Sequence, residues 1–583
     1  MTLARLIAGF VRRHWRAYAI SALMLTAIAV LTVSIPRRVG HLVDGLATHS
    51  LGQSALLQQL GLLAATGVAI YLLRVGWRQL LFAAAFQLGV ELRQRFYQRL
   101  AQQGPGFFQR QRTGDLMALA TNDIDAIEGA AGDALLAGFD GTQTLLMVLG
   151  AMLFGVDWRL ALVALLPFPF MAWAFARISR RIHDASREAL QRFAQLNDHV
   201  QQSVSGVRTL RALGLEPRSS GQFQQLAGAA AAASAKAQRW EAAFEPAVGL
   251  TLAASSALTL AAGSYLVLQG ELTVGQLTSF GMYLAQLIWP MWAAGWVLAL
   301  IERGKAAWAR LLPVLEAPLA IGDDGRHDVA PSGTIRLQAA CARYGAEQAP
   351  ALQDIDLQIA PGQTIGVVGP TGCGKSTLVR LLLRQLEPSA GSVAWGATAL
   401  HDYPLARLRA AMAWVPQESF LFSAPIAENI ALGRPDASQA QIEAAARMAA
   451  IHEDILRFPH GYQTEVGERG ITLSGGQRQR VAIARALLAE CPLLLLDDAL
   501  SAVDTGTETR ILRHLAELRA RQPERAVLIT SHRLSAVADA DEILVLKDGR
   551  VTERGTHAEL LALQGWYASQ WRYQQLEASL DAA

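Results

Sequence analysis

Residues 369–376 of this 583-residue chain read Gly-Pro-Thr-Gly-Cys-Gly-Lys-Ser and match the pattern G-x-x-x-x-G-K-[ST] in full. The glycines let the backbone wrap so that its N–H groups point at phosphate oxygens, and a helix N-terminus adds a favourable dipole. The apolar run Thr364–Val368 predicts a strand that enters the loop, and Ser376–Leu386 predicts the helix that leaves it. We therefore expect Lys375 to reach the β- and γ-phosphates of ATP, and Ser376 to bind Mg²⁺.

A second phosphate-related feature is the run Leu493–Leu496, which is followed by two aspartates. A buried strand that ends in a carboxylate can hold a metal ion at the carboxyl edge of a parallel sheet. Such a run is weak evidence by itself, but it gains force from the glycine loop upstream. We assign Asp497 to Mg²⁺, through water.

The segment Leu473-Ser-Gly-Gly-Gln477 precedes a predicted helix over Arg478–Leu488. A serine and two glycines at a helix N-terminus form an anion site. One domain does not need two such sites for one triphosphate, so this loop is expected to clasp the γ-phosphate of ATP bound to another copy of the domain. The alternative is a simple glycine turn before a surface helix.

The composition points to a membrane. Apolar residues make up 52% and charged residues 17% of the chain, against about 25% charged in soluble domains. The net charge of +3 gives no reason to expect a nucleic-acid partner. A spanning helix needs about 20 mostly apolar residues. Six runs qualify, if the third, which is short over Gly141–Val156, begins near Ala134. They are Ala17–Ile35, Ala55–Leu73, Ala134–Val156, Leu160–Ala176, Pro246–Leu268 and Leu277–Ile301.

Positive charge is concentrated on one side of these runs, which predicts that this side and both termini face the cytosol. The arginines concerned are Arg5, Arg12, Arg13, Arg16, Arg93, Arg95, Arg99, Arg110, Arg112, Arg177, Arg180, Arg181, Arg187, Arg192, Arg208, Arg211 and Arg218. The polar connections 87–134 and 177–245 keep helical periodicity, so we expect helices 2 to 5 to continue into the cytosol. Separate soluble hairpins are the alternative.

The composition changes near residue 315, where short apolar runs and glycine turns begin. We predict an all-α six-helix transmembrane domain over 1–315, a linker over 316–332, and an α/β P-loop nucleotide-binding domain over 333–583. The strand-like runs Leu493–Leu496 and Ala526–Thr530 support the α/β assignment.

Together these motifs resemble the ABC exporter family over nearly the whole chain. LSGGQ at 473–477 resembles the ABC signature, and TGDLMALATNDID at 113–125 resembles the first intracellular loop of these exporters. The resemblance places coupling helices near Gly114–Leu119 and Ser205–Leu213. It also makes TEVGERG, at 464–470, the segment that touches them.

The resemblance also implies the roles of individual residues. Tyr344 occupies the adenine-stacking position, Gln417 the loop that senses the γ-phosphate, 501–504 the dimer-interface loop, and His532 the switch position. The implied nucleotide-binding set is Tyr344, Gly369, Pro370, Thr371, Gly372, Cys373, Gly374, Lys375, Ser376, Thr377, Gln417, Ser474, Gly475, Gly476, Gln477 and His532. The implied metal set is Ser376, Gln417 and Asp497, and the implied catalytic set is Asp498, His532, Gln417 and Lys375.

One residue departs from the family pattern. Hydrolytic ABC sites carry glutamate after the metal aspartate, and this chain carries Asp498. The shorter side chain holds its carboxylate about 1.5 Å closer to the backbone. A misplacement of roughly 1 Å can cost about 10²-fold in rate. We expect this chain's own site to bind ATP and hydrolyse it slowly.

An intact signature beside a weakened hydrolytic site suggests a heterodimer. The second half-transporter would then carry the glutamate and an altered signature. The segments VELRQRFYQRL (90–100) and YQQLEASLDAA (573–583) resemble subunits of heterodimeric bacterial multidrug ABC exporters.

The membrane half offers fewer signals. One helical face carries three tryptophans, Trp289, Trp292 and Trp296. They form either the wall of a cavity for amphiphilic substrates or an aromatic surface that packs against lipid. Asp140 lies in an apolar segment and faces either a cation-binding cavity or an ordinary polar contact. Arg37 and Arg38 lie at the outer interface or face a water-filled cavity.

The sequence thus predicts an ATPase coupled to transport in the bacterial cytoplasmic membrane, exporting hydrophobic or amphiphilic compounds in contact with membrane lipids. Two alternatives stay open. One is a homodimeric exporter or lipid flippase with slow turnover, which a transport-active homodimer would favour. The other is a nucleotide-gated membrane sensor, which vesicle uptake that tracks ATP hydrolysis would exclude.

Overall fold

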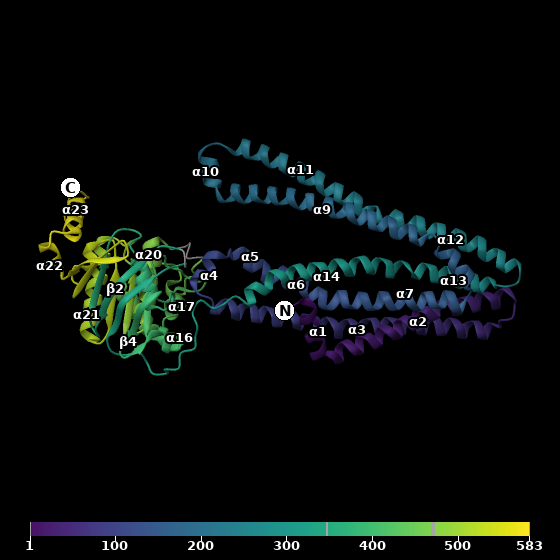
Figure 1. The fold of residues 1–583 in the computed structure, drawn as a ribbon, viewed down its shortest axis with the longest axis horizontal. Helices are drawn as coiled ribbons and strands as arrows, with labels where there is room; N and C mark the ends of the chain where they lie inside the picture. The colour runs from purple at the N-terminus through teal and green to yellow at the C-terminus, as the bar shows by residue number, and fades with distance from the viewer. Residues whose placement is uncertain (1, 346–347, 468–472, 582–583) are drawn as a thin grey trace. The chain divides into compact units, whose positions relative to one another are not determined.

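The computed structural model describes residues 2–345, 348–467 and 473–581. The chain forms two compact units (Figure 1). The first consists of Met1–Arg99 and Gly114–Ala317, and the second of Leu100–Thr113 and Pro318–Ala583. The second unit therefore contains a short segment, 100–113, that lies between two membrane helices in the sequence.

Long apolar helices make up the first unit. Among the described residues, six helices are long and apolar enough to cross a membrane, which confirms the predicted number. They are Trp15–Ala47 (α2), Gln53–Gln102 (α3), Thr113–Gly155 (α5 to α7), Trp158–Ser205 (α8 and α9), Glu216–Leu268 (α11 and α12) and Val274–Leu315 (α13 and α14). A short helix, α1 (Leu3–Arg13), precedes them.

The third of these long helices is assembled from several pieces. Its parts are α5 (Thr113–Ala118), a π-helical turn at Leu119–Asp123, α6 (Ile124–Gly129), a second π-helical turn at Ala130–Ala134, and α7 (Leu135–Gly155). The other paired labels are α8 (Trp158–Leu165), α9 (Phe168–Ser205), α11 (Glu216–Ala242), α12 (Phe244–Leu268), α13 (Val274–Gln286) and α14 (Ile288–Leu315).

The polar connections continue the apolar helices, as predicted. Helix α3 runs without interruption to Gln102, and α9 runs beside α11 through the polar stretch 177–245 (Figure 1). Short helices join the long ones at α4 (Pro105–Arg110) and α10 (Val207–Ala212). Helix α10 coincides with the second predicted coupling position.

The coupling role of the first predicted position, Gly114–Leu119, stays a prediction. Those residues begin the next long helix, and the separate short helix is α4. Gly104 precedes it in extended conformation, and Pro105 takes the first helical position, where its missing N–H costs nothing. Phe107 of α4 is buried within the second unit, which shows that this helix packs there.

Helices α2 and α13 approach each other closely at one end of the first unit. Gly40 and Gly275 face each other, and a Cβ atom on either glycine would overlap the other's carbonyl oxygen. Asp44 Oδ1 accepts a hydrogen bond from Gly275 N at 2.7 Å, and Asp44 Oδ2 accepts one from Thr273 Oγ1 at 2.7 Å. This carboxylate thus satisfies donors at the N-terminus of α13 and ties α2 to it.

A cavity of about 630 Å³ lies beside this contact, with Arg37, His41 and Tyr283 in its wall. Arg37 therefore faces a cavity, one of its two predicted settings. Arg38 is not in that wall, and its Nη1 is buried without a hydrogen-bond partner among the described residues.

Two sheets organise the second unit. The larger has strand order β10-β9-β3-β8-β7-β6, in which β10 alone pairs antiparallel. Its strands are β3 (Thr364–Val368), β6 (Met412–Val415), β7 (Leu493–Asp497), β8 (Ala526–Thr530), β9 (Glu542–Lys547) and β10 (Arg550–Gly555). These bounds confirm the three strands predicted at 364–368, 493–496 and 526–530.

The smaller sheet is antiparallel and was not predicted strand by strand. Its order is β2-β1-β4-β5, with β1 (Ile335–Ala342), β2 (Leu352–Ile359), β4 (Ala390–Trp395) and β5 (Thr398–Ala399). The helices of this unit are α15 (Lys375–Leu382), α16 (Leu405–Ala410), α17 (Ile426–Ala431), α18 (Gln439–Met448), α19 (His452–Leu456), α20 (Gly475–Leu488), α21 (Thr505–Arg521), α22 (His557–Ala562) and α23 (Trp566–Asp581).

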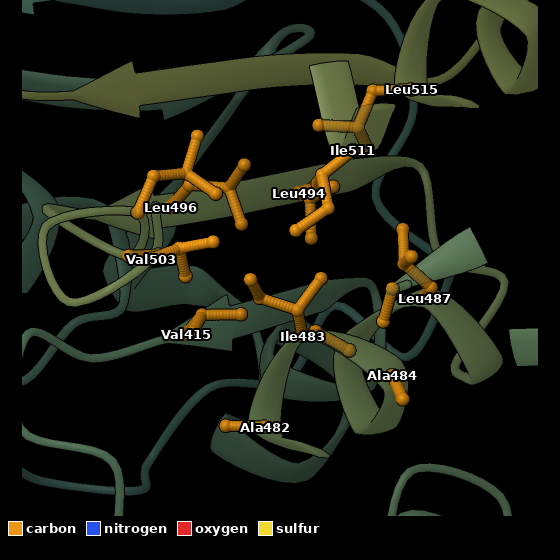
Figure 2. Close-up of a cluster of buried hydrophobic side chains, with 14 of the residues drawn as sticks. Val415, Ala482, Ile483, Ala484, Leu487, Leu494, Leu496, Val503, Ile511 and Leu515 are labelled. Carbon is orange, nitrogen blue, oxygen red and sulfur yellow. The ribbon is translucent and has the colours of Figure 1, made fainter. Parts of the chain in front are cut away.

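The core of the second unit lies between the larger sheet and its helices. Figure 2 shows Ile483 and Leu487 of α20 beside Leu494 and Leu496 of β7, with Ile511 of α21 closing the cluster. All five are at most 3% exposed, so the strand that carries Asp497 is fixed on this face by apolar packing. The site therefore rests on a rigid strand rather than on a loop.

The glycine contact between α2 and α13 gives a stability prediction. We expect Gly275→Ala to lower the free energy of unfolding by about 1–3 kcal/mol, because the new methyl group overlaps the backbone of α2. Thermal unfolding of the full chain in detergent measures this change. Gly281→Ala, on the same helix with open space around it, is the control and should be neutral or stabilising by up to about 1 kcal/mol. Equal midpoints for the two variants would contradict the contact.

Candidate functional site

The phosphate loop lies where β3 ends and α15 begins. Gly369 has φ +149° and Gly374 has φ +109°, in a region that side chains rarely occupy. A Cβ atom on Gly374 would also lie 2.6 Å from Ala351 O, so both conformation and space require glycine there. The backbone forms the predicted turn, and the loop leads into the N-terminus of α15, where backbone N–H groups are available to an anion.

Lys375 is 7% exposed and turns back onto its own loop. Its Nζ donates to Gly369 O at 2.8 Å and to Pro370 O at 3.1 Å. The two carbonyls hold the ammonium group over the loop, where a phosphate would sit. The remaining residues of the predicted loop, Thr371, Gly372 and Cys373, lie within the same turn, and Cys373 is buried.

Two of the three predicted magnesium ligands, Ser376 and Asp497, meet. Ser376 Oγ donates to Asp497 Oδ1 at 2.9 Å, and Thr530 Oγ1 donates to the same oxygen at 2.8 Å. Hydroxyl and carboxylate oxygens are the ligands that Mg²⁺ takes, usually with phosphate and water completing the shell. Among the described residues, no group of three or more His, Cys, Asp or Glu could cage a metal alone. The site thus fits an ion shared with a triphosphate.

Gln417, which follows β6, lies elsewhere. Its Nε2 donates to Asp498 Oδ2 at 3.3 Å, so this hydrogen bond joins Gln417 to the catalytic candidate and not to Ser376. Its metal-binding role stays a prediction.

Asp498 lies at the centre of a network of hydrogen bonds. Its φ of +50° is unusual for a residue with a side chain. Its backbone N–H, donating to Thr530 O at 3.0 Å, holds this conformation. Its carboxylate also accepts from His532 N at 3.4 Å. Asp498 is 7% exposed.

Burial and neighbouring charges shift the pKa values of Asp498 and His532. Burial raises the pKa of Asp498, while His532 and Lys375 oppose that rise and Asp497 adds to it. Burial, together with the Lys375 charge, lowers the pKa of His532 below 6.5 despite the nearby carboxylates. The imidazole is therefore neutral near pH 7 and available to donate or accept one hydrogen bond.

Tyr344 lies at the side of α15. Its hydroxyl is 3.1 Å from Thr377 Oγ1 and accepts from Arg380 Nη1 at 2.9 Å. The Arg380 guanidinium lies 5.7 Å from the ring centroid, and the ring is 45% exposed. An aromatic ring beside the phosphate loop suits an adenine, and that role stays a prediction.

The signature segment forms a helix cap. Ser474 Oγ accepts from Gln477 N at 3.2 Å, and Gln477 Oε1 accepts from Ser474 N at 3.0 Å. This capping box starts α20, with Gly475 and Gly476 in its first turn. Ser474 and Gly475 are exposed. The predicted contact segment 464–470 lies outside the described residues from 468 onward.

The phosphate loop and the signature are not brought together. Among the described residues, no hydrogen bond or ion pair joins Ser474 or Gln477 to residues 369–376. Gln477 Nε2 instead donates to Asp454 Oδ1 at 3.5 Å. The two anion sites therefore lie at separate positions in the described part of the domain.

The sequence reasoning missed Gln574, in the last helix, α23. Its Nε2 donates to His532 O at 2.8 Å, and its Oε1 accepts from Leu534 N at 2.9 Å. One amide thus holds both sides of the loop that carries His532. No motif marks this residue, and only the packing of α23 reveals it.

The same loop is joined to the 501–504 segment. Arg533 Nη1 donates to Val503 O at 3.0 Å and to Glu508 Oε2 at 2.7 Å. Glu508 is 3% exposed, so this charge pair is largely withdrawn from solvent. The predicted switch and interface loops are therefore mechanically linked.

Comparisons with known proteins agree with this architecture. Residues 18–291 match the family described as "ABC transporter transmembrane region", and residues 352–501 match the family described as "ABC transporter". The chain is 43% identical to the "Multidrug resistance-like ATP-binding protein MdlA" of Escherichia coli (strain K12), covering 100% of this chain and 98% of that protein.

Two further matches extend the comparison. The "ATP-dependent lipid A-core flippase" of Chromobacterium violaceum is 32% identical, with 99% of this chain and 98% of that protein covered. A solved structure described as "a bacterial Atm1-family ABC exporter with ATP bound" has a TM-score of 0.80 at 29% identity, covering 97% of this chain and 98% of the other.

The Gln574 clamp yields a prediction. Gln574→Leu removes two hydrogen bonds to the His532 loop, so the maximal rate of ATP hydrolysis should fall about threefold to tenfold. That factor corresponds roughly to the net free energy of one hydrogen bond. The nucleotide concentration at half-saturation should change less than about twofold, because the contacts of 369–376 are untouched.

Gln575→Leu is the matched control, since its neighbouring side chain is exposed on the same helix. Hydrolysis at this chain's own site, measured over a range of ATP concentrations in a membrane complex whose partner site is inactivated, gives both quantities. A loss of equal size in the two variants would show that the clamp does not position His532.

Proposed function

The chain belongs to the ABC transporter family, with an exporter-type transmembrane region followed by an ATP-binding domain, and from this premise we propose its specific role. It is one half of an exporter that moves hydrophobic or amphiphilic compounds out of the cytosol or the inner leaflet. It lies in a bacterial cytoplasmic membrane, with both termini and the nucleotide-binding domain in the cytosol. ATP with Mg²⁺ drives it, and a second half-transporter completes it.

The observation that carries this proposal is the separation of the two anion sites. Within the described chain, no hydrogen bond or ion pair joins the loop 369–376 to the signature at Ser474, although both present helix N-termini. Two such domains opposed head to tail would place one signature on the phosphates held by the other loop. ATP would then bind the two domains together, and that closure would move the long helices.

The residues of the loop have defined tasks in this scheme. Lys375 would exchange the carbonyls of Gly369 and Pro370 for phosphate oxygens. Mg²⁺, when bound, neutralises negative charge on the phosphates. Ser376 and Asp497 hold that ion, and Asp497 is itself oriented by Thr530.

Asp498 would orient the attacking water, and the neutral His532 would contact the γ-phosphate. The Asp498 carboxylate is one methylene shorter than glutamate and is already held by Gln417 and the His532 amide. Both features hold it away from a water at the γ-phosphate. We infer that this site binds ATP firmly and hydrolyses it slowly. A different half-transporter with a glutamate and an altered signature would use the intact signature of this chain.

The compound class rests on the relatives. One is named as multidrug resistance-like and another as a lipid A-core flippase, and both descriptions fit apolar or amphiphilic cargo. The flippase relative also favours the second candidate, a homodimeric exporter or lipid flippase with two Asp498 sites and slow turnover.

Asp498→Glu tests the hydrolytic assignment. We expect turnover at this site to rise by about 10-fold to 10²-fold, because the carboxylate gains about 1.5 Å of reach. Single-turnover hydrolysis of bound ATP, in a complex whose partner site is inactivated, isolates this site. Asp498→Asn is the control and should stay at or below the rate of the parent. If Asp498→Glu were no faster than the parent, side-chain length would not limit the site.

A cross-linking experiment tests the pairing. Two tagged copies of this chain are expressed without any partner, one carrying Thr371→Cys and the other Ser474→Cys, both with Cys373→Ala to remove the native thiol of the loop. A heterodimer predicts little cross-linking between the copies when ATP is added. Efficient ATP-dependent cross-linking would reject the heterodimer and support the homodimeric candidate.

A further inference from the structure

Asp140 is the one ionisable residue in the sequence of helix α7, Leu135–Gly155. A carboxylate inside a membrane span is costly, and such residues usually face a protein interior or a pathway. The structure gives Asp140 a defined neighbour: Trp289 Nε1, on α14, donates to Asp140 Oδ2 at 2.9 Å. An indole is a neutral donor, so this contact orients the carboxylate without balancing its charge.

The charge is not balanced elsewhere in the described chain. Among those residues, Asp140 forms no ion pair with Lys, Arg or His. Helix α13 and the first half of α14, up to Ile301, carry no charged residue in their sequence. Asp140 is partly exposed, and among the described residues its one hydrogen bond is the one that Oδ2 accepts from Trp289.

An aromatic face begins at this carboxylate with Trp289. Trp289, Trp292 and Trp296 are 49%, 50% and 43% exposed, and their spacing places them on one face of α14. Phe244 of α12 lies 6.4 Å from Trp292 between ring centroids, and Phe175 of α9 lies 4.9 Å from Phe244. Aromatic rings from three helices therefore extend away from the Asp140 contact.

The position of Trp289 speaks against an interfacial role. Tryptophans of the aromatic belt lie at the ends of membrane spans. Trp289 lies at the middle of the apolar run Leu277–Ile301, whereas Trp158, 59% exposed, stands at the start of α8. A surface that only packed against lipid would also give no reason for a carboxylate at Asp140.

We propose that Asp140 and the tryptophan face of α14 form a binding site for hydrophobic cations. The carboxylate supplies charge attraction, and the faces of Trp289, Trp292 and Trp296 supply cation–π attraction and apolar area. A carboxylate attracts a cation and repels an anion of the same shape, and both effects are larger in surroundings less polar than water. The role of this site in transport rests on the proposed exporter function, and it narrows the substrate class of that exporter to hydrophobic cations. Binding of a cation to the site does not depend on transport.

The test compares two ions of nearly equal size and opposite charge. Tetraphenylphosphonium and tetraphenylborate are titrated against the full chain in lipid nanodiscs without ATP, with empty nanodiscs subtracted. We expect saturable binding of the cation and no saturable binding of the anion. Asp140→Asn, whose amide oxygen can still accept from Trp289, should weaken cation binding about tenfold or more. Asp140→Glu should retain it.

Two further variants separate the site from general effects. Trp292→Leu should weaken cation binding about threefold to tenfold, because it removes an aromatic face but no hydrogen bond to Asp140. Glu302→Gln, which removes a carboxylate from an exposed ion pair with Lys305 on the same helix, should leave binding unchanged. Equal binding of both ions, or an unchanged cation affinity in Asp140→Asn with parental thermal stability, would overturn the site.

The site and the transport function fail separately. If the cation binds through Asp140 but ATP drives no uptake of it into inverted vesicles, the binding site stands and the exporter proposal fails for this class. If binding ignores Asp140 while ATP drives uptake of other amphiphiles, the exporter proposal stands and this site is rejected.

Discussion

The hydrogen bonds that Asp497 accepts from Ser376 and Thr530 are the interaction on which the nucleotide-binding unit depends. They join the carboxyl ends of β7 and β8 to the helix that follows β3, so three separate sequence segments meet at one oxygen atom. Parallel pairing of β3 with β8 and of β8 with β7 makes this possible, because all carboxyl ends lie on one sheet edge. The apolar packing of β7 against α20 then fixes that edge in place.

Around this centre, hydrogen bonds from other segments hold the loops that carry Gln417 and His532, for which we predict nucleotide contacts. Gln417 and the His532 amide reach Asp498 from different strands, and Gln574 holds the far side of the His532 loop. Arg533 ties that same loop to the 501–504 segment through Val503. A displacement of one loop therefore strains the others, which is the property expected of a unit whose nucleotide contacts must change together.

The membrane unit follows another constraint, because helices in lipid gain little from burying apolar surface. Close packing and polar contacts hold them instead: Gly40 against Gly275, the Asp44 cap on α13, and Trp289 on Asp140. Helix α3 carries the chain beyond the apolar run, and the segment 100–113 that follows it clusters with the nucleotide-binding unit. The chain therefore passes directly from a membrane helix into a segment that packs with the nucleotide-binding unit.

The sequence by itself determined the six apolar helices, the strands at 364–368, 493–496 and 526–530, and the motif residues, because hydrophobic periodicity and glycine-rich spacing are local signals. Only the tertiary structure decided that Gln417 meets Asp498, that Gln574 holds the His532 loop, and that Trp289 meets Asp140. It also revealed a separate short helix at Pro105–Arg110 and placed Gly114–Leu119 at the start of the next long helix. These contacts join residues far apart in the chain, and no local pattern encodes which distant side chain will arrive opposite a given amide or carboxylate.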